Sequence, residues 1–283
     1  MNPLDPRVTA ARPDLAAAHL EGKVSAPRYV AGRSMHLAIE CADLHHAPSR
    51  DSALDTQVLY GEDLTLYAAE AGWAWVQLAR DSYVGYLSLD ALAEGEAQAT
   101  HRVAVNRSFI YPRPDIKAPI LAPLPLGAAV KLAGIEGAFG RLANGGYVFA
   151  RHFMRSDERA DDFVTVAEAL LGAPYLWGGK SCLGLDCSGL VQIALAQAGI
   201  NAPRDTDLQQ QALGNTLALE TASRDLRRGD LIFWKGHVGI MRDATTLLHA
   251  NAHHMLVASE PLATARTRIA ARAGGEIVAI NRF

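Results

Sequence analysis

The stretch Leu185-Asp186-Cys187-Ser188-Gly189-Leu190-Val191 places a cysteine where a glycine-rich loop runs into a helix. The helix is predicted to be amphipathic and to end at Gly199, because apolar residues recur at helical spacing at Leu190, Val191, Ala194, Leu195 and Ala198. A thiol at a helix N-terminus lies beside unpaired N–H groups and the positive end of the helix dipole, and both favour the thiolate. We therefore expect Cys187 to be a nucleophile.

Two histidines follow in short apolar stretches that are typical of strands. His237 lies in residues 236–241 and His249 in residues 247–251. A single cysteine before a helix is often only a small buried hydrophobe, and a single strand histidine is often structural. The combination favours catalysis, with Cys187 as nucleophile, His237 as general base and His249 as the residue that orients the imidazole.

A zinc site is the alternative use of the same residues. His253 and His254 extend the histidine cluster, and Cys182 precedes Cys187 by five residues. Adjacent histidines in a strand point to opposite faces, however, and the chain has no Cys-x-x-Cys or His-x-x-x-His pattern. The sequence therefore predicts no metal and no cofactor.

Composition limits the partners and the compartment. The chain has 283 residues, 49% hydrophobic residues and a formal net charge of −3, without a run of Lys and Arg. These features argue against nucleic acid or an anionic membrane as a partner. Three cysteines are too few for a disulfide framework, and the proline-rich start shows no apolar targeting segment. We expect a cytoplasmic protein, and oligomeric state is not readable.

The N-terminal half divides into an arm and a duplicated module. Residues 1–30 form the arm, with a short helix expected at Ala10 to Leu20. Four landmarks then recur about 65 residues apart: Pro48 and Pro112, Gly61 and Gly127, Gly72 and Gly137, Tyr83 and Tyr147. Short apolar runs between Gly, Pro and Asp predict two small β-barrels, at residues 31–97 and 98–156.

Residues 157–283 change character, from β-barrel patterns to helices followed by strands. Helices are expected over residues 163–171, 187–198, 205–213 and 262–271. Strands are expected over residues 231–234, 238–242, 246–249 and 277–281. Helices that precede an antiparallel sheet predict an α+β domain.

This C-terminal part resembles the NlpC-type cysteine peptidases, which are papain-like enzymes that cut peptidoglycan peptides. Six strings carry the resemblance, in the family's order: residues 174–179, 185–191, 203–206, 228–233, 236–240 and 248–250. Both barrels resemble bacterial SH3-like domains, the second more weakly. The expected fold class is therefore multidomain, with two small all-β SH3-like barrels followed by an α+β papain-like cysteine peptidase domain.

The resemblance also implies roles for individual residues. It assigns the catalytic triad to Cys187, His237 and His249, and it places the hydroxyl of Tyr175 where it helps to stabilise an oxyanion. The backbone N–H of Cys187 is a second expected donor, because helix N-termini leave such groups unpaired. Taken alone, Tyr175 would be interpreted as a core aromatic in a loop.

The domain combination resembles γ-D-glutamyl-L-diamino acid endopeptidases of murein peptide recycling. Their substrates are stem peptides of the form L-Ala-γ-D-Glu-diamino acid with a free N-terminal L-Ala, and the diamino acid is diaminopimelate or lysine. The residues expected to bind the substrate ammonium are Asp186, Ser188, Glu62 and Tyr83. As structural alternatives, Glu62 is a hairpin-turn carboxylate and Tyr83 a barrel aromatic. The functional alternatives are a papain-like amidase or acyltransferase and a non-catalytic protein that binds cell-wall peptides.

Overall fold

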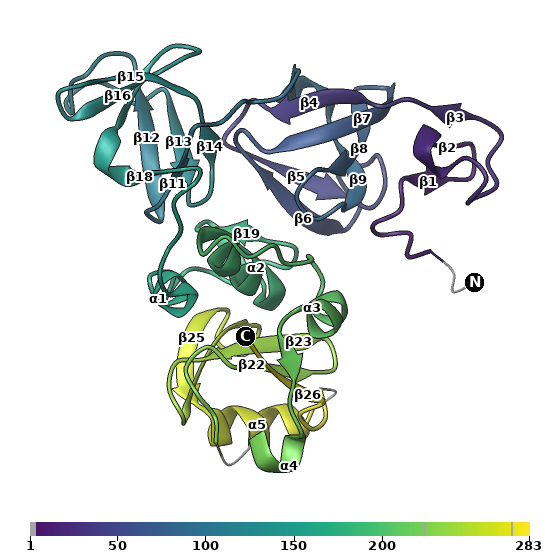
Figure 1. Cartoon of the computed structure of the whole chain (residues 1–283), viewed down its shortest axis with the longest axis vertical. Helices are drawn as coiled ribbons and strands as arrows, with labels where there is room; N and C mark the ends of the chain where they lie inside the picture. The colour runs from purple at the N-terminus through teal and green to yellow at the C-terminus, as the bar shows by residue number, and fades with distance from the viewer. Residues whose placement is uncertain (1–3, 223–224, 273) are drawn as a thin grey trace. The chain divides into compact units, whose positions relative to one another are not determined.

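A computed structural model describes residues 4–222, 225–272 and 274–283 of the chain. The chain divides into two compact units, Met1–Asp157 and Glu158–Phe283. Each unit has its own sheets, which Figure 1 shows, and its own hydrophobic clusters. The boundary lies one residue beyond the start expected for the C-terminal domain, so the change of character in the sequence coincides with a division in space.

The N-terminal arm is a small sheet, and the helix expected at Ala10 to Leu20 is wrong. Strands β1 (Ala11–Arg12) and β2 (Leu15–Ala17) form a hairpin, β3 (Tyr29–Val30) pairs with β2, and η1 (Ala18–Leu20) is a single 3₁₀ turn. Proline cannot donate a backbone hydrogen bond, so Pro13 favours a turn over a helix here. The arm packs its apolar residues against Trp75 of the next module.

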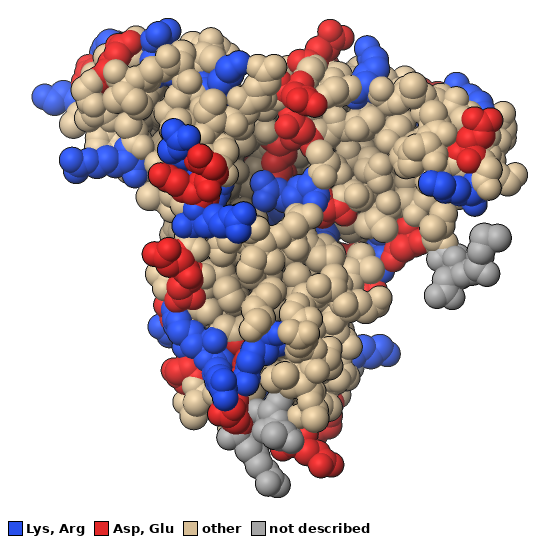
Figure 2. Space-filling view, viewed as in Figure 1, with Lys and Arg blue, Asp and Glu red and all other residues tan. Residues whose placement is uncertain are grey.

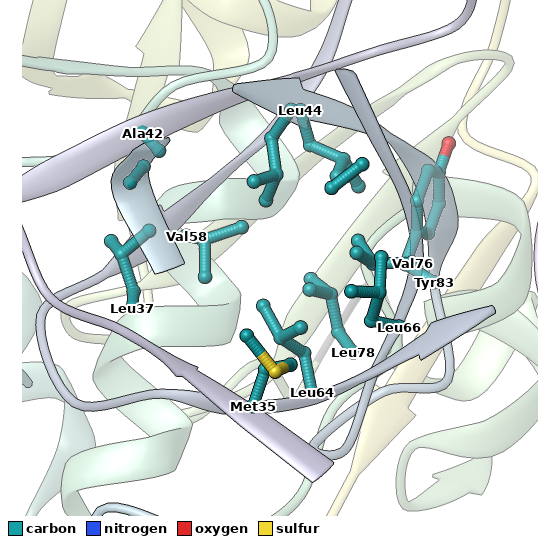
Figure 3. Packing of buried hydrophobic residues seen from close by; sticks show 13 residues of the cluster. Met35, Leu37, Ala42, Leu44, Val58, Leu64, Leu66, Val76, Leu78 and Tyr83 are labelled. Atoms are coloured by element: carbon teal, nitrogen blue, oxygen red, sulfur yellow. The ribbon is translucent and has the colours of Figure 1, made fainter. Parts of the chain in front are cut away.

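The first module is a seven-stranded antiparallel sheet with the strand order β10-β4-β7-β8-β9-β5-β6. Its strands are β4 (Arg33–Leu37), β5 (Cys41–His45), β6 (Leu54–Leu59), β7 (Asp63–Glu70), β8 (Trp73–Leu78), β9 (Val84–Ser88) and β10 (Leu92–Glu94), with the 3₁₀ turn η2 (Leu89–Ala91) before β10. Alternate residues such as Met35 and Leu37 point inward, as the period of a strand requires. Figure 3 shows the resulting core, with the ring of Tyr83 at its edge.

The second module repeats the strand pairing of the first. Its strands are β11 (His101–Val103), β12 (Arg107–Tyr111), β13 (Ala122–Pro125), β14 (Ala129–Val130), β15 (Leu132–Glu136), β16 (Phe139–Leu142), β17 (Tyr147–Phe149) and β18 (Phe153–Arg155), with η3 (Ala150–His152) before β18. The pairings run β18-β11-β14 and β15-β16-β17-β12-β13, which is the order of the first module with β7 divided into β14 and β15.

The glycines that revealed the repeat have the same backbone conformation in both modules. Gly61 and Gly127 have φ values of 73° and 86°, and Gly72 and Gly137 have values of 80° and 60°. These angles lie in the left-handed region, which glycine adopts without the steric cost that a Cβ brings. The spacing in the sequence therefore records turns at matching places in the two modules.

The C-terminal unit is built on a six-stranded antiparallel sheet with the order β21-β26-β22-β23-β24-β25. Its strands are β21 (Asn215–Thr216), β22 (Leu231–Trp234), β23 (His237–Met241), β24 (Thr246–Asn251), β25 (Leu256–Pro261) and β26 (Ala279–Arg282). A short hairpin, β19 (Lys180–Ser181) and β20 (Gly184–Leu185), precedes the sheet. The predicted strands over residues 231–234, 238–242 and 246–249 are confirmed, whereas β25 was not predicted.

The helices of this unit are α1 (Phe163–Glu168), α2 (Cys187–Gln197), α3 (Thr206–Ala212), α4 (Leu219–Ala222) and α5 (Leu262–Ala270). Helix α2 packs against β23 and β24 of the sheet and also against α1, α3 and β19. It is therefore buried almost all round, and the amphipathic helix predicted from its sequence is wrong. A helix that is covered on all sides needs no polar face.

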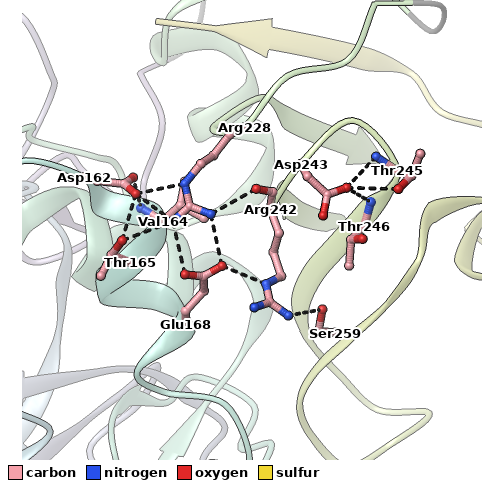
Figure 4. A network of polar contacts seen from close by, with 10 residues as sticks. All are labelled: Asp162, Val164, Thr165, Glu168, Arg228, Arg242, Asp243, Thr245, Thr246 and Ser259. Atoms are coloured by element: carbon pink, nitrogen blue, oxygen red, sulfur yellow. Dashed lines mark hydrogen bonds and ion pairs between the residues drawn. The ribbon is translucent and has the colours of Figure 1, made fainter.

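A network of charged side chains joins α1 to the sheet (Figure 4). Arg228 donates to Asp162 at 2.6 Å and to Glu168 at 3.0 Å. Arg242 donates to the same Glu168 at 2.8 Å and to Ser259 of β25 at 2.9 Å. The network links the two ends of α1 to the chain around β22, β23 and β25, and so fixes the framework that holds α2.

Charges of both signs are interspersed on the face drawn in Figure 2. None of the helices in the described ranges has the length and apolar character that crossing a membrane requires.

Candidate active site

Helix α2 begins at Cys187 because Asp186 caps it. The backbone of Asp186 is extended, and its side chain accepts a hydrogen bond from the N–H of Gly189. This arrangement is the usual N-cap, in which a short polar side chain satisfies an unpaired donor of the first turn. The cap sets the thiol of Cys187 at the first helical position, as the sequence predicted.

The carboxylate of Asp186 is surrounded by donors. Its Oδ1 accepts from Gly189 N–H at 2.7 Å and its Oδ2 from Gly178 N–H at 2.9 Å. Arg204, which is 1% exposed, donates to the two oxygens at 3.0 and 2.6 Å. Ser188 Oγ accepts from Arg204 at 2.8 Å and lies 3.3 Å from Asp186 Oδ1. These contacts hold the loop, the turn before α3 and the start of α2 together.

This network limits how Asp186 and Ser188 can bind a substrate. Both residues were predicted to bind an ammonium group, yet both are already bonded to Arg204. A ligand ammonium would have to replace the long contact between Ser188 and Asp186, which is the weakest of the set by distance. Their contact with substrate stays a prediction.

The two predicted imidazoles are hydrogen-bonded to each other. His237 begins β23, His249 lies on the neighbouring strand β24, and His237 Nε2 is 2.8 Å from His249 Nδ1. The second nitrogen of His249 continues the chain, because Nε2 lies 2.8 Å from Oε1 of Glu260 on β25. Three adjacent strands therefore hold the two imidazoles and the carboxylate in one line.

The sulfur of Cys187 lies at the start of β23. The backbone N–H of Val238, the residue after His237, donates to it, and Thr206 Oγ1 is 3.8 Å away. The N-terminus of α2, which carries the nucleophile, thus meets the strand that carries the predicted base. The structure brings together Cys187, His237 and His249 within the C-terminal unit.

Burial determines the resting protonation of the pair. It raises the pKa of the Cys187 thiol to about 11, with the charge of Asp186 adding to the effect. Burial also lowers the pKa of His237 to about 3, assisted by the charge that His249 can carry. In the resting site, desolvation and the neighbouring carboxylate therefore favour the thiol, contrary to the predicted preference for thiolate. The thiol needs a base to remove its proton.

Tyr175 lies close enough to feel the charge of the nucleophile. Burial, with the charges of Cys187 and Asp186 adding to the effect, raises the pKa of its phenol to about 12. The phenol is therefore neutral and able to donate over the physiological range. Backbone bonds fix its loop, since Tyr175 N–H donates to Met255 at 2.9 Å. Its role at an oxyanion stays a prediction.

Glu62 and Tyr83 belong to the N-terminal unit, where each has structural contacts. Glu62 Oε2 accepts from the N–H of Leu59 at 2.9 Å, and Oε1 lies 3.4 Å from Arg80 Nε. Tyr83 is 4% exposed and packs in the core of the first module. These contacts agree with the structural alternatives for both residues, and a role in binding substrate stays a prediction.

The histidine cluster has one group of donors close enough to share a metal, in the part of the chain that the structure describes. It consists of His249, His254 and Glu260. Arg268 donates to both oxygens of Glu260, so a guanidinium already occupies the side of the carboxylate where a cation would bind. The pattern of hydrogen bonds therefore favours an imidazole–carboxylate relay over a metal site.

Three residues of this site were not predicted from the sequence: Arg204, Glu260 and Arg268. Arg204 lies in the string 203–206 that supported the family resemblance, but the number of residues between Asp186 and Arg204 does not predict that the two form an ion pair. Glu260 and Arg268 could have been found only by predicting β25, whose alternating residues Leu256 to Glu260 carry a weak strand pattern.

Two family matches cover the modules described above. Residues 44–92 match the bacterial dipeptidyl-peptidase SH3 domain, and residues 172–269 match the NlpC/P60 family. The second match contains Cys187, His237, His249 and Glu260. The first covers most of the first module, from the end of β5 to the start of β10.

Relatives and a solved structure extend the likeness over most of the chain. The chain is 29% identical over 230 residues to the gamma-D-glutamyl-L-lysine dipeptidyl-peptidase of Bacillus subtilis (strain 168), covering 71% of this chain and 73% of the relative. It is 26% identical over 234 residues to dipeptidyl-peptidase 6 of Lysinibacillus sphaericus, covering 74% and 84%. A crystal structure of an NlpC/P60 family protein from Bacillus cereus superposes with a TM-score of 0.73 at 20% identity, covering 88% of this chain and 99% of that one.

The solved structure supports the fold, and the family matches identify the domains that carry the site. Together with a cysteine at the head of α2 and paired imidazoles on the adjacent sheet, they lead to one conclusion: the chain carries an NlpC/P60 family peptidase domain preceded by a bacterial dipeptidyl-peptidase SH3 domain.

Proposed function

We propose that this peptidase is a cysteine endopeptidase that hydrolyses the γ-D-glutamyl-L-diamino acid bond of peptidoglycan stem peptides with a free N-terminal L-Ala. The observation that carries the proposal is the line of hydrogen bonds from His237 through His249 beside the buried thiol of Cys187. The name of the Bacillus subtilis relative, a gamma-D-glutamyl-L-lysine dipeptidyl-peptidase that aligns with 71% of this chain, supports the choice of bond.

In this mechanism the resting thiol is activated at the moment of attack. His237 takes the proton of Cys187 as the sulfur forms a bond to the γ-carbonyl carbon of D-Glu. The carbonyl oxygen becomes an oxyanion, which accepts hydrogen bonds from the Tyr175 hydroxyl and the Cys187 backbone N–H. The C–N bond then breaks, and His237 returns the proton to the leaving amine. Water, with His237 again as base, hydrolyses the thioester and restores the thiol.

Recognition of the free N-terminus is the finer part of the proposal. A substrate ammonium that enters the site would meet Ser188 and Asp186 at the head of α2. On the family resemblance, Glu62 and Tyr83 of the SH3 domain are the further residues that we propose bind it. An acylated N-terminus carries no ammonium, so it cannot make the charge-assisted hydrogen bonds that a free amine would make with these carboxylates, and this loss disfavours acylated peptides. Stem peptides still attached to glycan through L-Ala are acylated there and would be rejected.

The selectivity suggests where the enzyme works. An enzyme that rejects glycan-linked peptides acts on released fragments, and we propose that it meets them in the cytoplasm. Its partners would then be soluble stem peptides, with diaminopimelate or lysine at the third position. We further propose that the second module, which has the strand order of the first, is a second SH3-like barrel.

The test is mass spectrometry of the products from L-Ala-γ-D-Glu-diaminopimelate and from the same peptide acetylated at its N-terminus. The enzyme should release L-Ala-γ-D-Glu from the free peptide, and acetylation should lower kcat/KM more than tenfold. Glu62→Ala should lower kcat/KM for the free peptide but have little effect on the acetylated one. The control is Glu70→Ala, an exposed carboxylate of the same module, which should change neither. Equal cleavage of both peptides would contradict the recognition proposal.

A further inference from the structure

Glu260 has a protein partner on each side. Arg268 on α5 donates to its Oε2 at 2.7 Å and also to its Oε1, and His249 Nε2 lies 2.8 Å from Oε1. The side chain of Glu260 is 9% exposed and that of Arg268 is 16% exposed. Burial alone would raise the pKa of Glu260, but the hydrogen bonds from Arg268 and His249 outweigh burial and hold the pKa well below its usual range. The carboxylate is therefore ionised and can only accept hydrogen bonds.

An ionised acceptor at this position fixes the proton on His249. Because the carboxylate has no proton to give, Nε2 of His249 must carry the hydrogen of the 2.8 Å bond. Burial lowers the pKa of His249, although the bond to Glu260 partly offsets this effect. His249 is thus neutral, and a neutral imidazole protonated on Nε2 has its lone pair on Nδ1.

The same reasoning extends to His237. Its Nε2 faces the lone pair of His249 Nδ1 at 2.8 Å, so His237 Nε2 must donate. His237 is also neutral, since its pKa is lowered to about 3. Its lone pair therefore lies on Nδ1, the ring nitrogen that the relay leaves available for the proton of Cys187.

The reverse order of protons would disable the base. If His249 carried its proton on Nδ1, it would donate to His237 Nε2, and His237 Nδ1 would then be protonated. It could not accept a proton from the thiol. Four charged or titratable groups face His249 from its surroundings: His237 on β23, His254 after β24, Glu260 on β25 and Arg268 on α5. Among these four groups, only Glu260 acts as an acceptor at every pH above its own pKa.

We propose that Glu260, held by Arg268, is a positioning residue that fixes the tautomers of His249 and His237, so that Nδ1 of His237 is the nitrogen that removes the proton from Cys187. The inference deepens the proposed function and rests on it only in taking Cys187 as the nucleophile. It adds a fourth and a fifth residue to the line Cys187–His237–His249.

The test compares Glu260→Gln with Glu276→Gln in the full chain. Glu276 pairs with Arg266 at 3.0 Å on the surface and makes no contact with the two imidazoles. Glu276→Gln is therefore a matched control, because it too removes one carboxylate charge next to an arginine of α5. Thermal melting confirms that each variant is folded. Two readouts need no peptide substrate: the ring ¹⁵N chemical shifts of labelled histidines, and the alkylation rate of Cys187 by iodoacetamide at pH 7.5, followed by peptide mass.

In the parent protein and in Glu276→Gln, we expect His237 and His249 to be protonated on Nε2. In Glu260→Gln the amide can present either its oxygen or its NH₂ group to His249, so the two tautomers should mix and alkylation of Cys187 should slow about tenfold or more, as for other lost supports of a functional imidazole. Unchanged tautomers and an unchanged alkylation rate in Glu260→Gln would overturn the proposal. So would Nδ1 protonation of either residue in the parent protein.

A second variant separates the carboxylate from its clamp. Arg268→Gln keeps Glu260 in place, so the tautomers should persist and alkylation should slow less than in Glu260→Gln. A larger loss in Arg268→Gln than in Glu260→Gln would contradict the assignment. Hydrolysis of L-Ala-γ-D-Glu-diaminopimelate should follow the same order, with kcat falling and KM little changed. If no variant and no parent protein cleaves this peptide, the proposed substrate fails while the tautomer measurement still decides the role of Glu260.

Discussion

At the scale of single residues, Cys187 is subject to two opposing influences. Its place at the head of α2 favours thiolate, whereas its burial and the neighbouring Asp186 favour thiol. Burial prevails in the resting site, and the imidazole next to it is neutral as well. The thiol of Cys187 and the imidazole of His237 are both uncharged until the proton moves between them. The hydrogen bonds through His249 keep His237 in the tautomer that can accept this proton.

The neutral imidazoles predict a pH dependence of stability. The pKa of His237 falls from an ordinary value of about 6.5 to about 3 on folding, and that of His249 falls too. Below pH 6.5 the unfolded chain binds protons that the folded relay does not, so the stability present above pH 6.5 is lost as the pH falls. Urea unfolding at pH 7, 6 and 5 should show this loss, up to about 1.4 kcal/mol per pH unit for His237.

His237→Asn removes one of the two groups and should flatten this dependence. The titration of Glu260 adds little above pH 5, because its folded pKa is lowered and its contribution is lost mainly as the pH falls below the ordinary pKa of a glutamate. A free energy of unfolding that stays constant between pH 7 and pH 5 would contradict neutral burial of the imidazoles, as would an equal slope in His237→Asn.

At the scale of elements, the position of the nucleophile depends on how α2 starts. Arg204 reaches from the turn before α3 to both oxygens of Asp186, and it is almost completely buried. Removing one member of a buried ion pair leaves the other charge without compensation, at a cost of about 3–5 kcal/mol. Arg204→Met should therefore lower the free energy of unfolding by an amount in this range. Urea unfolding measures the change.

Arg227→Met provides the comparison for this variant. Arg227 pairs with Asp225 at 2.6 Å, but both side chains are 62% exposed, and exposed pairs contribute little to stability. Its free energy of unfolding should stay close to that of the parent chain. Equal small losses in the two variants would show that Arg204 does not hold the start of α2.

Sequence patterns predicted the strands and helices in which apolar residues recur at regular spacing, and they missed the features that depend on packing. The strands around His237 and His249 and the start of α2 at Cys187 follow from local apolar runs and a cap. The prediction that α2 is amphipathic was wrong because neighbouring elements cover α2 almost completely. The sequence of a single helix does not show how many neighbours will pack against it. The helix expected at Ala10 to Leu20 was wrong because Pro13 turns the chain into a hairpin. β25, and with it Glu260, was missed because its pattern is short.

The sequence predicted the residues of the candidate site better than the contacts between them. The family resemblance supplied Cys187, His237 and His249, but the bidentate contact of Arg204 and the clamp of Arg268 join residues that are distant in sequence or on separate elements. Such pairs have no fixed spacing, and only the fold brings them together.

At the scale of the whole molecule, the two units divide the proposed tasks. Every residue of the hydrogen-bond line and of the Asp186 network lies in Glu158–Phe283, whereas Glu62 and Tyr83 lie in Met1–Asp157. A chain of residues 158–283 should therefore keep the alkylation rate of Cys187. Its kcat/KM should be reduced and its preference for the free peptide over the acetylated one should be smaller, because Glu62 and Tyr83 are gone while Asp186 and Ser188 remain.

Product analysis of this shortened chain beside the full chain checks the division. Retention of the full preference for the free peptide would assign the selectivity to Asp186 and Ser188 alone. Loss of the alkylation rate along with the selectivity would show that the catalytic relay needs the N-terminal unit to form.

The central claim is that the Cys187 thiol performs the hydrolysis. Mass spectrometry of L-Ala-γ-D-Glu-diaminopimelate after incubation with the full chain and with Cys187→Ala tests it most directly. The full chain should release L-Ala-γ-D-Glu and the folded variant should release none, while the melting temperature of the variant should stay close to that of the parent. Release at an equal rate by Cys187→Ala would contradict it.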